Sequence, residues 1–235
     1  MSKIIEVQNL NKTYSVKNEK QTIFIDANFI VNEKESCGII GKSGSGKSTL
    51  AKILIGIEKY NAGNITILGT NINELLKSKK TFYSNIQYIY QNSYETFDSL
   101  YSVGDIICEI MALHNIESSY KKRKEKVLNL LALYGFTNSE EIFNRKSIEL
   151  SGGQLQRIAL IRAMMVNPKI LILDEPLGMM DVITRQEIIE MLKKIMNANN
   201  ITLIYISHEI YSMKELCKKA YIIKNKSLIE YSLNN

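Results

Sequence analysis

The stretch that decides the fold is Gly41-Lys42-Ser43-Gly44-Ser45-Gly46-Lys47-Ser48. It fits the pattern G-x-x-x-x-G-K-[ST] in full, with an apolar strand expected before it at Cys37–Ile40 and a helix expected after it from Lys47 to Ile57. Glycines let backbone N–H groups turn inward around phosphate oxygens, and the helix start adds the positive end of its dipole. The pattern therefore predicts a nucleotide site in which Lys47 reaches the β- and γ-phosphates and Ser48 ligates Mg²⁺.

A second acidic element ends the apolar run Ile170-Leu171-Ile172-Leu173, which Asp174 and Glu175 follow. Adjacent side chains of a strand point to opposite faces, but at the end of a strand the chain can turn both carboxylates toward one ligand. Asp174 is the better partner for Mg²⁺, through a water molecule, and Glu175 is placed to polarise the attacking water. Behind a phosphate-binding loop, this pair predicts hydrolysis.

Strands and helices alternate along the first and last parts of the chain. The expected strands are Ile4–Val7, Ile23–Val31, Cys37–Ile40, Asn64–Leu68, Ile86–Tyr90, Ile170–Leu173, Ile201–Ile206 and, as the last one, Ala220–Ile223. Further helices are expected at Val103–Leu113 and Tyr120–Tyr134, after Gly153, at Val182–Met196 and at Glu209–Lys218. The alternation predicts an α/β fold with a mostly parallel, buried sheet. We expect a single domain, with residues 1–91 and 168–235 as its core and a helical part at residues 92–167.

Composition narrows the class of protein. The chain has 235 residues, of which 45% are hydrophobic, and a formal charge of +6 that is spread along it. The basic cluster at residues 121–124 is interpreted as the solvated face of a helix, and no nucleic-acid partner is expected. There is no apolar run long enough to span a membrane and no apolar signal core at the start. Three scattered cysteines favour neither disulfides nor zinc, so we expect a protein made and kept in the cytoplasm.

The run Leu150-Ser151-Gly152-Gly153-Gln154 precedes the acidic pair by a helix and a turn. A serine and two glycines at a helix N-terminus form a second anion site, which one chain does not need for one nucleotide. With this run, the chain resembles a nucleotide-binding domain of the ATP-binding-cassette family over almost its whole length. The resemblance implies a P-loop NTPase with a RecA-like core, an antiparallel β subdomain and a helical signature subdomain. It also implies that Ser151, Gly152, Gly153 and Gln154 contact ATP held by an opposite subunit.

The resemblance assigns further residues one by one. Tyr14 matches the aromatic that stacks on adenine, and Gln91 matches the Q-loop glutamine, which senses Mg²⁺ and the membrane partner. Asp181 matches the D-loop aspartate, and His208 matches the switch histidine that contacts the γ-phosphate. The expected catalytic residues are Lys47, Gln91, Glu175 and His208, the expected Mg²⁺ ligands are Ser48, Gln91 and Asp174, and the expected ATP contacts are Tyr14, Gly41, Lys42, Ser43, Gly44, Ser45, Gly46, Lys47, Ser48 and Thr49.

Two places depart from the usual family pattern. The D-loop reads Gly178-Met179-Met180-Asp181, where Ser-Ala-Leu-Asp is more common. The switch region has Glu209 after His208, where aspartate is usual. Neither change removes a catalytic group, and both bear on coupling between the two ATP sites.

The resemblance implies an ATP-hydrolysing motor that works with a second cassette and two integral membrane permeases, at the cytoplasmic face of the membrane. The alternatives are a non-transport member of the family, such as an iron–sulfur assembly ATPase, an exporter ATPase, or a binding module with an inactive site. The intact set Lys47, Gln91, Asp174, Glu175 and His208 favours an active enzyme over the inactive module.

The segment after Gln91 resembles that of peptide and nickel importer ATPases, which carry an Asp-Pro-aromatic-Ser-Ser-Leu-Asn-Pro-like stretch and then a Val-Gly helix start. Tyr94, Phe97, Asp98 and the pair Val103-Gly104 fall in register, while both prolines are replaced and the Pro-containing tail is missing. The resemblance implies that this segment forms the groove for the permease's coupling helix. It further implies pairing with a different cassette in preference to a homodimer, an extracytoplasmic solute-binding protein, and peptides, nickel or metal chelates as cargo.

Overall fold

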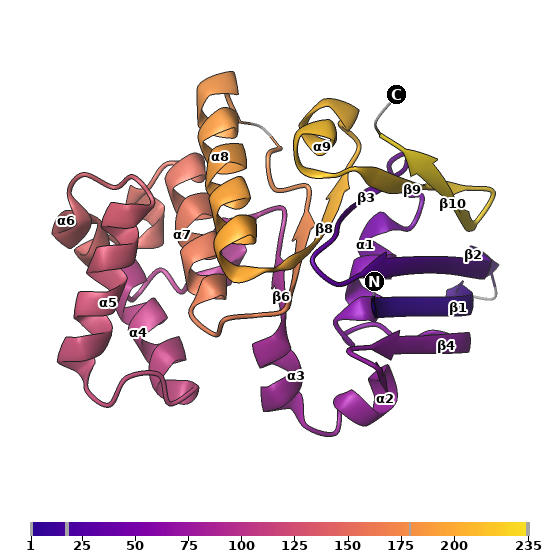
Figure 1. Ribbon diagram of the computed structural model, residues 1–235, viewed down its shortest axis with the longest axis horizontal. Coiled ribbons are helices and arrows are strands. Elements are labelled where there is room, and N and C mark those ends of the chain that lie inside the picture. Colours follow the sequence, from indigo (N-terminus) through magenta and orange to yellow (C-terminus); the bar gives the residue numbers. More distant parts are fainter. Residues whose placement is uncertain (1, 17–18, 179, 234–235) are drawn as a thin grey trace. The chain divides into compact units, whose positions relative to one another are not determined.

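The computed structural model describes residues 2–16, 19–178 and 180–233, and the chain divides into two compact units (Figure 1). The first unit comprises Met1–Tyr88, Lys169–Glu175 and Ile195–Asn235. The second comprises Ile89–Pro168 and Pro176–Lys194, so the chain leaves the first unit and returns to it twice. In the described part of the chain, no helix combines the length and the apolar character that crossing a membrane requires.

An antiparallel sheet with the strand order β2-β1-β4-β5 forms one layer of the first unit. Its strands are β1 (Lys3–Val16), β2 (Glu19–Asn32), β4 (Ala62–Ile67) and β5 (Thr70–Asn71). The first two strands run well beyond the apolar segments that predicted them. Their pairing shifts register at bulges, where Asn9 and Asp26 adopt positive φ, so the strands continue through polar residues that break the alternating pattern.

A second sheet, which contains the predicted parallel strands, has the strand order β10-β9-β3-β8-β7-β6. Its strands are β3 (Ser36–Ile40), β6 (Ile86–Ile89), β7 (Ile170–Asp174), β8 (Thr202–Ser207), β9 (Lys219–Lys224) and β10 (Ser227–Ser232). Strand β3 runs parallel to both β8 and β9, and β7 runs parallel to β8. The predicted α/β class, with one mostly parallel and one antiparallel sheet, is confirmed.

The prediction that Ala220–Ile223 is the last strand is wrong. Strand β10 follows β9 and pairs with it antiparallel through a two-residue turn at Asn225 and Lys226, with φ of 50° and 62°. Such a turn needs positive φ at both positions, and its usual signal is Asn-Gly. Because Lys226 stands where glycine is usual, the sequence gives no signal for this hairpin.

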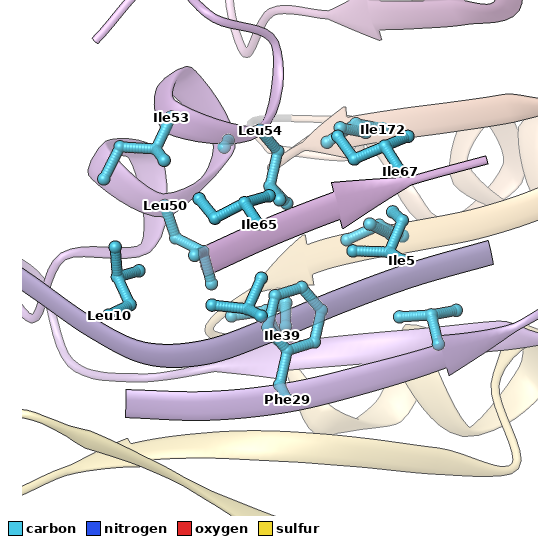
Figure 2. Packing of buried hydrophobic residues seen from close by; sticks show 14 of the residues in the cluster. Ile5, Leu10, Phe29, Ile39, Leu50, Ile53, Leu54, Ile65, Ile67 and Ile172 are labelled. Carbon is cyan, nitrogen blue, oxygen red and sulfur yellow. The ribbon is translucent and has the colours of Figure 1, made fainter. Parts of the chain in front are cut away.

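Helix α1 (Lys47–Leu54) packs into a core shared with both sheets (Figure 2). Leu50, Ile53 and Leu54 of this helix lie against buried side chains such as Ile65 of β4 and Ile39 of β3. The helix ends three residues before the predicted Ile57, because Gly56 turns the chain with φ of 70°. The remaining helices of the first unit are α2 (Ile72–Leu75), α3 (Lys79–Asn85) and α9 (Ile210–Leu216).

The second unit is built from helices. It contains η1 (Ser93–Thr96), α4 (Val103–Leu113), α5 (Tyr120–Leu133), α6 (Ser139–Asn144), η2 (Ser147–Glu149), α7 (Gly152–Met164) and most of α8 (Val182–Asn199). Serine side chains cap the starts of α4, α5 and α7, as the sequence signals for helix starts require.

Candidate nucleotide and hydrolysis site

The loop between β3 and α1 has the backbone that the glycine-rich pattern predicts. Gly46 sits just before the helix with φ of 108°, and a Cβ on it would lie 2.5 Å from Cγ2 of Ile23. A side chain would therefore be strained in conformation and would clash at the same position. The loop atoms from Lys42 to Gly44 are exposed, and Ser48 lies exposed on the first turn of α1 beside the half-buried Thr49. This leaves the loop open to a ligand.

Lys47 is buried and held by the loop itself. Its ammonium group donates to the carbonyl oxygens of Gly41 at 2.9 Å and Lys42 at 3.2 Å, and it lies 3.6 Å from Oε1 of Glu175. The exposed fraction of Lys47 is 6%, so its charge is largely removed from water. A buried ammonium with one carboxylate partner attracts further anions strongly, because screening there is weak.

Glu175 follows the end of β7 and links two other predicted residues. Its backbone N–H donates to the carbonyl of Ile206 at 2.8 Å, and its φ is 48°, an uncommon value for a residue other than glycine. The positive φ turns its carboxylate toward Lys47, while Oε2 lies 3.0 Å from Nδ1 of His208. His208 comes directly after β8 and is exposed. Lys47, Glu175 and His208 thus meet at the carboxyl ends of neighbouring parallel strands, where α/β proteins bind ligands.

Asp174 is 5% exposed, and its two carboxylate oxygens differ in their hydrogen bonds. Its Oδ2 accepts a hydrogen bond of 2.7 Å from the hydroxyl of Tyr88 on β6, whereas Oδ1 is buried with no hydrogen-bond partner among the described residues. A buried carboxylate oxygen without a donor is costly unless a ligand or a water molecule binds it. Tyr88 is a residue that the motifs did not indicate.

Tyr14 lies half-buried on β1, and a neighbouring lysine covers its ring. The ammonium of Lys12 sits 4.1 Å from the ring centroid and also forms an ion pair with Glu58. That ion pair is the main reason that the pKa of the Glu58 carboxyl lies below its usual value. A base stacking on Tyr14 would use the ring face opposite Lys12, and the adenine role of Tyr14 stays a prediction.

The remaining predicted residues belong to the second unit. Ser151 caps α7 by accepting from the N–H of Gln154 at 3.3 Å, and the Gln154 side chain accepts from the N–H of Ser151 at 3.0 Å. Gln154 is thereby engaged in holding its own helix end. Gly152 is exposed with open space at its Cα, so the start of α7 is accessible to an anion. Gln91 is also exposed, just after β6.

Asp181 and helix α7 both contact Thr184. Asp181 accepts from the N–H of Thr184 at 2.9 Å and from its hydroxyl at 2.7 Å, and these bonds lower the pKa of the carboxyl. A Cβ on Gly153 would lie 2.1 Å from Cγ2 of Thr184, so only glycine allows this approach. Met179 of the D-loop run lies outside the described residues.

Comparison with known proteins gives a family, relatives and solved structures. The family described as ABC transporter matches residues 24–178. The oligopeptide transport ATP-binding protein OppF of Haemophilus influenzae is 30% identical over 94% of this chain and 69% of its own length. The nickel import ATP-binding protein NikE of Shigella boydii is 30% identical over 92% of this chain and 80% of its own. The dimeric post-hydrolysis structure of the ATP-binding cassette MJ0796 with ADP and Pi has a TM-score of 0.86 at 26% identity, covering 98% of this chain and 99% of that one.

Proposed function

This chain belongs to the ABC transporter family, and from that membership we propose that it is the ATP-hydrolysing cassette of an importer of peptides or of nickel and its chelates. The observation that carries the proposal is the meeting of Lys47, Glu175 and His208 at one sheet edge beside the phosphate-binding loop. The loop supplies a cation and backbone donors for phosphate, and Glu175 supplies a carboxylate that can polarise water.

The contacts of Glu175 suggest how ATP binding would release this carboxylate for hydrolysis. The γ-phosphate and the Glu175 carboxylate are both anions, so they compete for the single ammonium of Lys47. When phosphate takes over Lys47, Glu175 keeps its contact with His208 and becomes free to orient an attacking water. The ion pair between Glu175 and Lys47 is the contact that phosphate is proposed to replace.

Magnesium fits the residues at the end of β7. Oδ1 of Asp174 is a buried carboxylate oxygen without a partner in the described chain, and Ser48 offers an exposed hydroxyl at the start of α1. Mg²⁺ prefers oxygen ligands and keeps several waters, which suits one carboxylate reached through water together with a hydroxyl and phosphate oxygens. Bound there, the ion would neutralise charge that develops on the phosphate oxygens. Gln91 is proposed to add an amide oxygen.

The start of α7 is proposed to bind ATP held by an opposing cassette. The first N–H groups of a helix have no partners within the helix, and Ser151 and Gly152 leave this end exposed. The related cassette MJ0796 is dimeric in its ADP- and Pi-bound structure, which supports a pair of cassettes here. We favour a different cassette as the partner, because the segment after Gln91 resembles those of importers that pair two unlike cassettes.

Membrane partners are proposed to dock on a groove in the second unit. The groove has a volume of about 700 Å³, and its lining includes Asp98, Tyr101, Asp105 and Glu109. Ile106 and Ala112 also line it, together with the basic Arg123, so apolar and mainly acidic side chains share this surface. Such a surface suits a short helix with apolar and basic residues from a permease. Two permeases and an extracytoplasmic solute-binding protein would complete the importer, with this chain bound peripherally at the cytoplasmic face.

Hydrolysis is tested by measuring phosphate release from ATP by the purified chain, alone and together with its co-purified membrane subunits. We expect Mg²⁺-dependent turnover that Lys47→Ala lowers at least about 100-fold, because the variant loses the buried cation directed at the phosphates. Lys52→Ala removes an equal charge from the exposed side of the same helix and should keep turnover. Near wild-type hydrolysis by Lys47→Ala would rule out this loop as the site.

A further inference from the structure

Tyr88 belongs to none of the motifs that define the site, yet its side chain reaches Asp174. The tyrosine lies on β6, and Asp174 ends β7, the neighbouring strand in the six-stranded sheet. The hydroxyl of Tyr88 donates to Oδ2 of Asp174 at 2.7 Å, while Oδ1 has no hydrogen-bond partner among the described residues. The carboxylate is thereby divided into one bonded oxygen and one that is left for a ligand.

We propose that Tyr88 is a positioning residue that fixes the rotation of the Asp174 carboxylate, so that Oδ1 and not Oδ2 serves the Mg²⁺ that accompanies ATP. This inference rests on the proposed function, since it requires Asp174 to act toward Mg²⁺. Tyr88 touches neither the metal nor the nucleotide in this account, and it acts only through Asp174.

The chemistry of the contact supports a fixed carboxylate. The terminal torsion of an aspartate is broad and roughly two-fold, so the carboxylate turns easily unless a neighbour holds one oxygen. A hydroxyl that donates to a charged carboxylate forms one of the stronger hydrogen bonds, with typical lengths of about 2.5–2.7 Å. Asp174 is 5% exposed, so bulk water does not readily replace the hydroxyl. Removing it would leave both oxygens to compete for the same ion.

The test uses Mn²⁺ as a spectroscopic substitute for Mg²⁺ in the full chain carrying Glu175→Gln, so that ATP is not consumed. Electron paramagnetic resonance gives the Mn²⁺ affinity in the presence of ATP, and calorimetry in EDTA gives the ATP affinity without metal. Tyr88→Phe removes only the hydroxyl. Tyr221→Phe is the matched control, because it removes a hydroxyl that contacts the backbone of Ile30 on β2 and the carboxylate of Glu230 on β10, and it leaves Asp174 untouched.

Tyr88→Phe should lower the Mn²⁺ affinity about tenfold, as is usual when a group that orients a metal ligand is lost. ATP affinity in EDTA should stay the same, which a general disturbance of the fold would not allow, and Tyr221→Phe should change neither quantity. Should a thermal melt show that Tyr88→Phe does not fold, Tyr88→Met repeats the measurement without a hydroxyl. Equal Mn²⁺ affinity in parent and variant overturns the role of Tyr88 alone. Absence of Mn²⁺ binding by the parent with ATP overturns the proposed function and this inference with it.

Discussion

At the scale of single residues, Glu175 carries the most specific chemistry. Its carboxylate lies between the ammonium of Lys47 and the imidazole of His208, on a backbone held at positive φ. We predict that Glu175→Gln keeps ATP binding and lowers turnover at least about 100-fold, because the amide fills the same space but cannot polarise water as the carboxylate does. Titration of ATP binding and single-turnover hydrolysis measure the two effects separately.

The same variant should hold ATP in a closed pair of cassettes, since hydrolysis no longer reopens it. Size-exclusion chromatography with ATP, on the chain alone and with its partner cassette, detects that pair. The matched variant Glu209→Gln makes the same change at the acid that follows His208 in the chain, and it should keep turnover. A Glu175→Gln protein that hydrolyses ATP at the normal rate would show that another residue is the base.

Short motifs predicted which residues meet at the site, because their spacing reflects a fixed local backbone. Lys47, Asp174, Glu175 and His208 each follow a strand or begin a helix that the sequence indicates. Tyr88 could not be predicted in the same way. Its contact with Asp174 spans 86 positions and depends on which strands are neighbours, which no local pattern encodes.

At the scale of elements, η1 is fastened to α7 by side chains within the second unit. Arg162 of α7 donates to the carbonyl oxygen of Thr96 at 2.6 Å and to its hydroxyl at 2.8 Å, and its guanidinium lies 4.1 Å from the ring of Phe97. Burial lowers the pKa of Arg162 to about 10. The hydroxyl of Tyr94 adds a bond of 2.6 Å to the carbonyl of Leu150, just before the signature serine. The segment after Gln91 and the helix that Ser151 begins are thereby joined.

We predict that Arg162→Ala lowers the free energy of unfolding by about 2 kcal/mol. The variant loses two hydrogen bonds of a charged donor and a cation–π contact, partly offset because no charge remains to be buried. Thr96→Val removes the hydroxyl that accepts from Arg162 and donates to the carbonyl oxygen of Ser93, and it should cost about 1 kcal/mol. Urea unfolding of both variants gives these values. A change below about 0.5 kcal/mol for Arg162→Ala would mean that the contact does not stabilise the fold.

Helices and strands could be predicted where nearby residues in the sequence indicate them. Helices α4 and α7 begin at capping serines and follow apolar spacing, so the sequence indicated them. Strands β1 and β2 extend through bulges, whose polar residues interrupt the alternation. Strand β10 follows a turn whose lysine gives no glycine signal. Backbone pairing with a neighbouring strand, not side-chain pattern, determines these missed segments.

At the scale of the whole molecule, the reactivity of the three cysteine thiols distinguishes the folded from the unfolded chain. Cys37, Cys108 and Cys217 are buried and free, and burial raises the pKa of the Cys37 thiol to about 12 and of the Cys108 thiol to about 11. Because thiolate is the reactive form, we predict that a thiol reagent at pH 8 labels the folded chain at least about a thousand times more slowly than the unfolded chain. Fast labelling of any of the three in native buffer would contradict this.

The raised pKa values of these thiols also determine whether the free energy of unfolding rises or falls with pH. An exposed thiol ionises near about pH 8.5, whereas these thiols keep their protons to about 11 or 12 in the fold. Between those values the unfolded chain binds fewer protons than the folded one, so the free energy of unfolding falls as pH rises. Urea midpoints measured from pH 8 to pH 11 should therefore decrease, and Cys108→Ala should reduce the slope.

The proposed coupling to a membrane partner concerns the whole molecule, and the acidic groove gives it a test. The chain carries a net charge of +6, yet Asp98, Asp105 and Glu109 gather along one groove. Like charges placed against each other across an interface cost several kcal/mol, so a basic permease helix would be repelled by a reversed groove. Glu109 is exposed, so reversing its charge should leave the fold intact. Glu125→Lys makes an equal change on an exposed position of α5 outside the groove.

We predict that deleting the gene lowers uptake of short peptides or of nickel, and that the wild-type chain restores it. The reasons are the partial resemblance of the segment after Gln91 to importer ATPases for such cargo and the likeness to OppF and NikE over most of this chain. Glu109→Lys should restore at least about tenfold less uptake than Glu125→Lys, while both purified variants hydrolyse ATP alike, because the charge reversal weakens docking and not the nucleotide site. Uptake of labelled peptides and of nickel in the complemented strains measures this.

If deletion leaves both uptakes unchanged, the proposed cargo is wrong, whereas the ATPase assignment stands on its own assay. If Glu109→Lys restores uptake fully, the groove is not the docking surface.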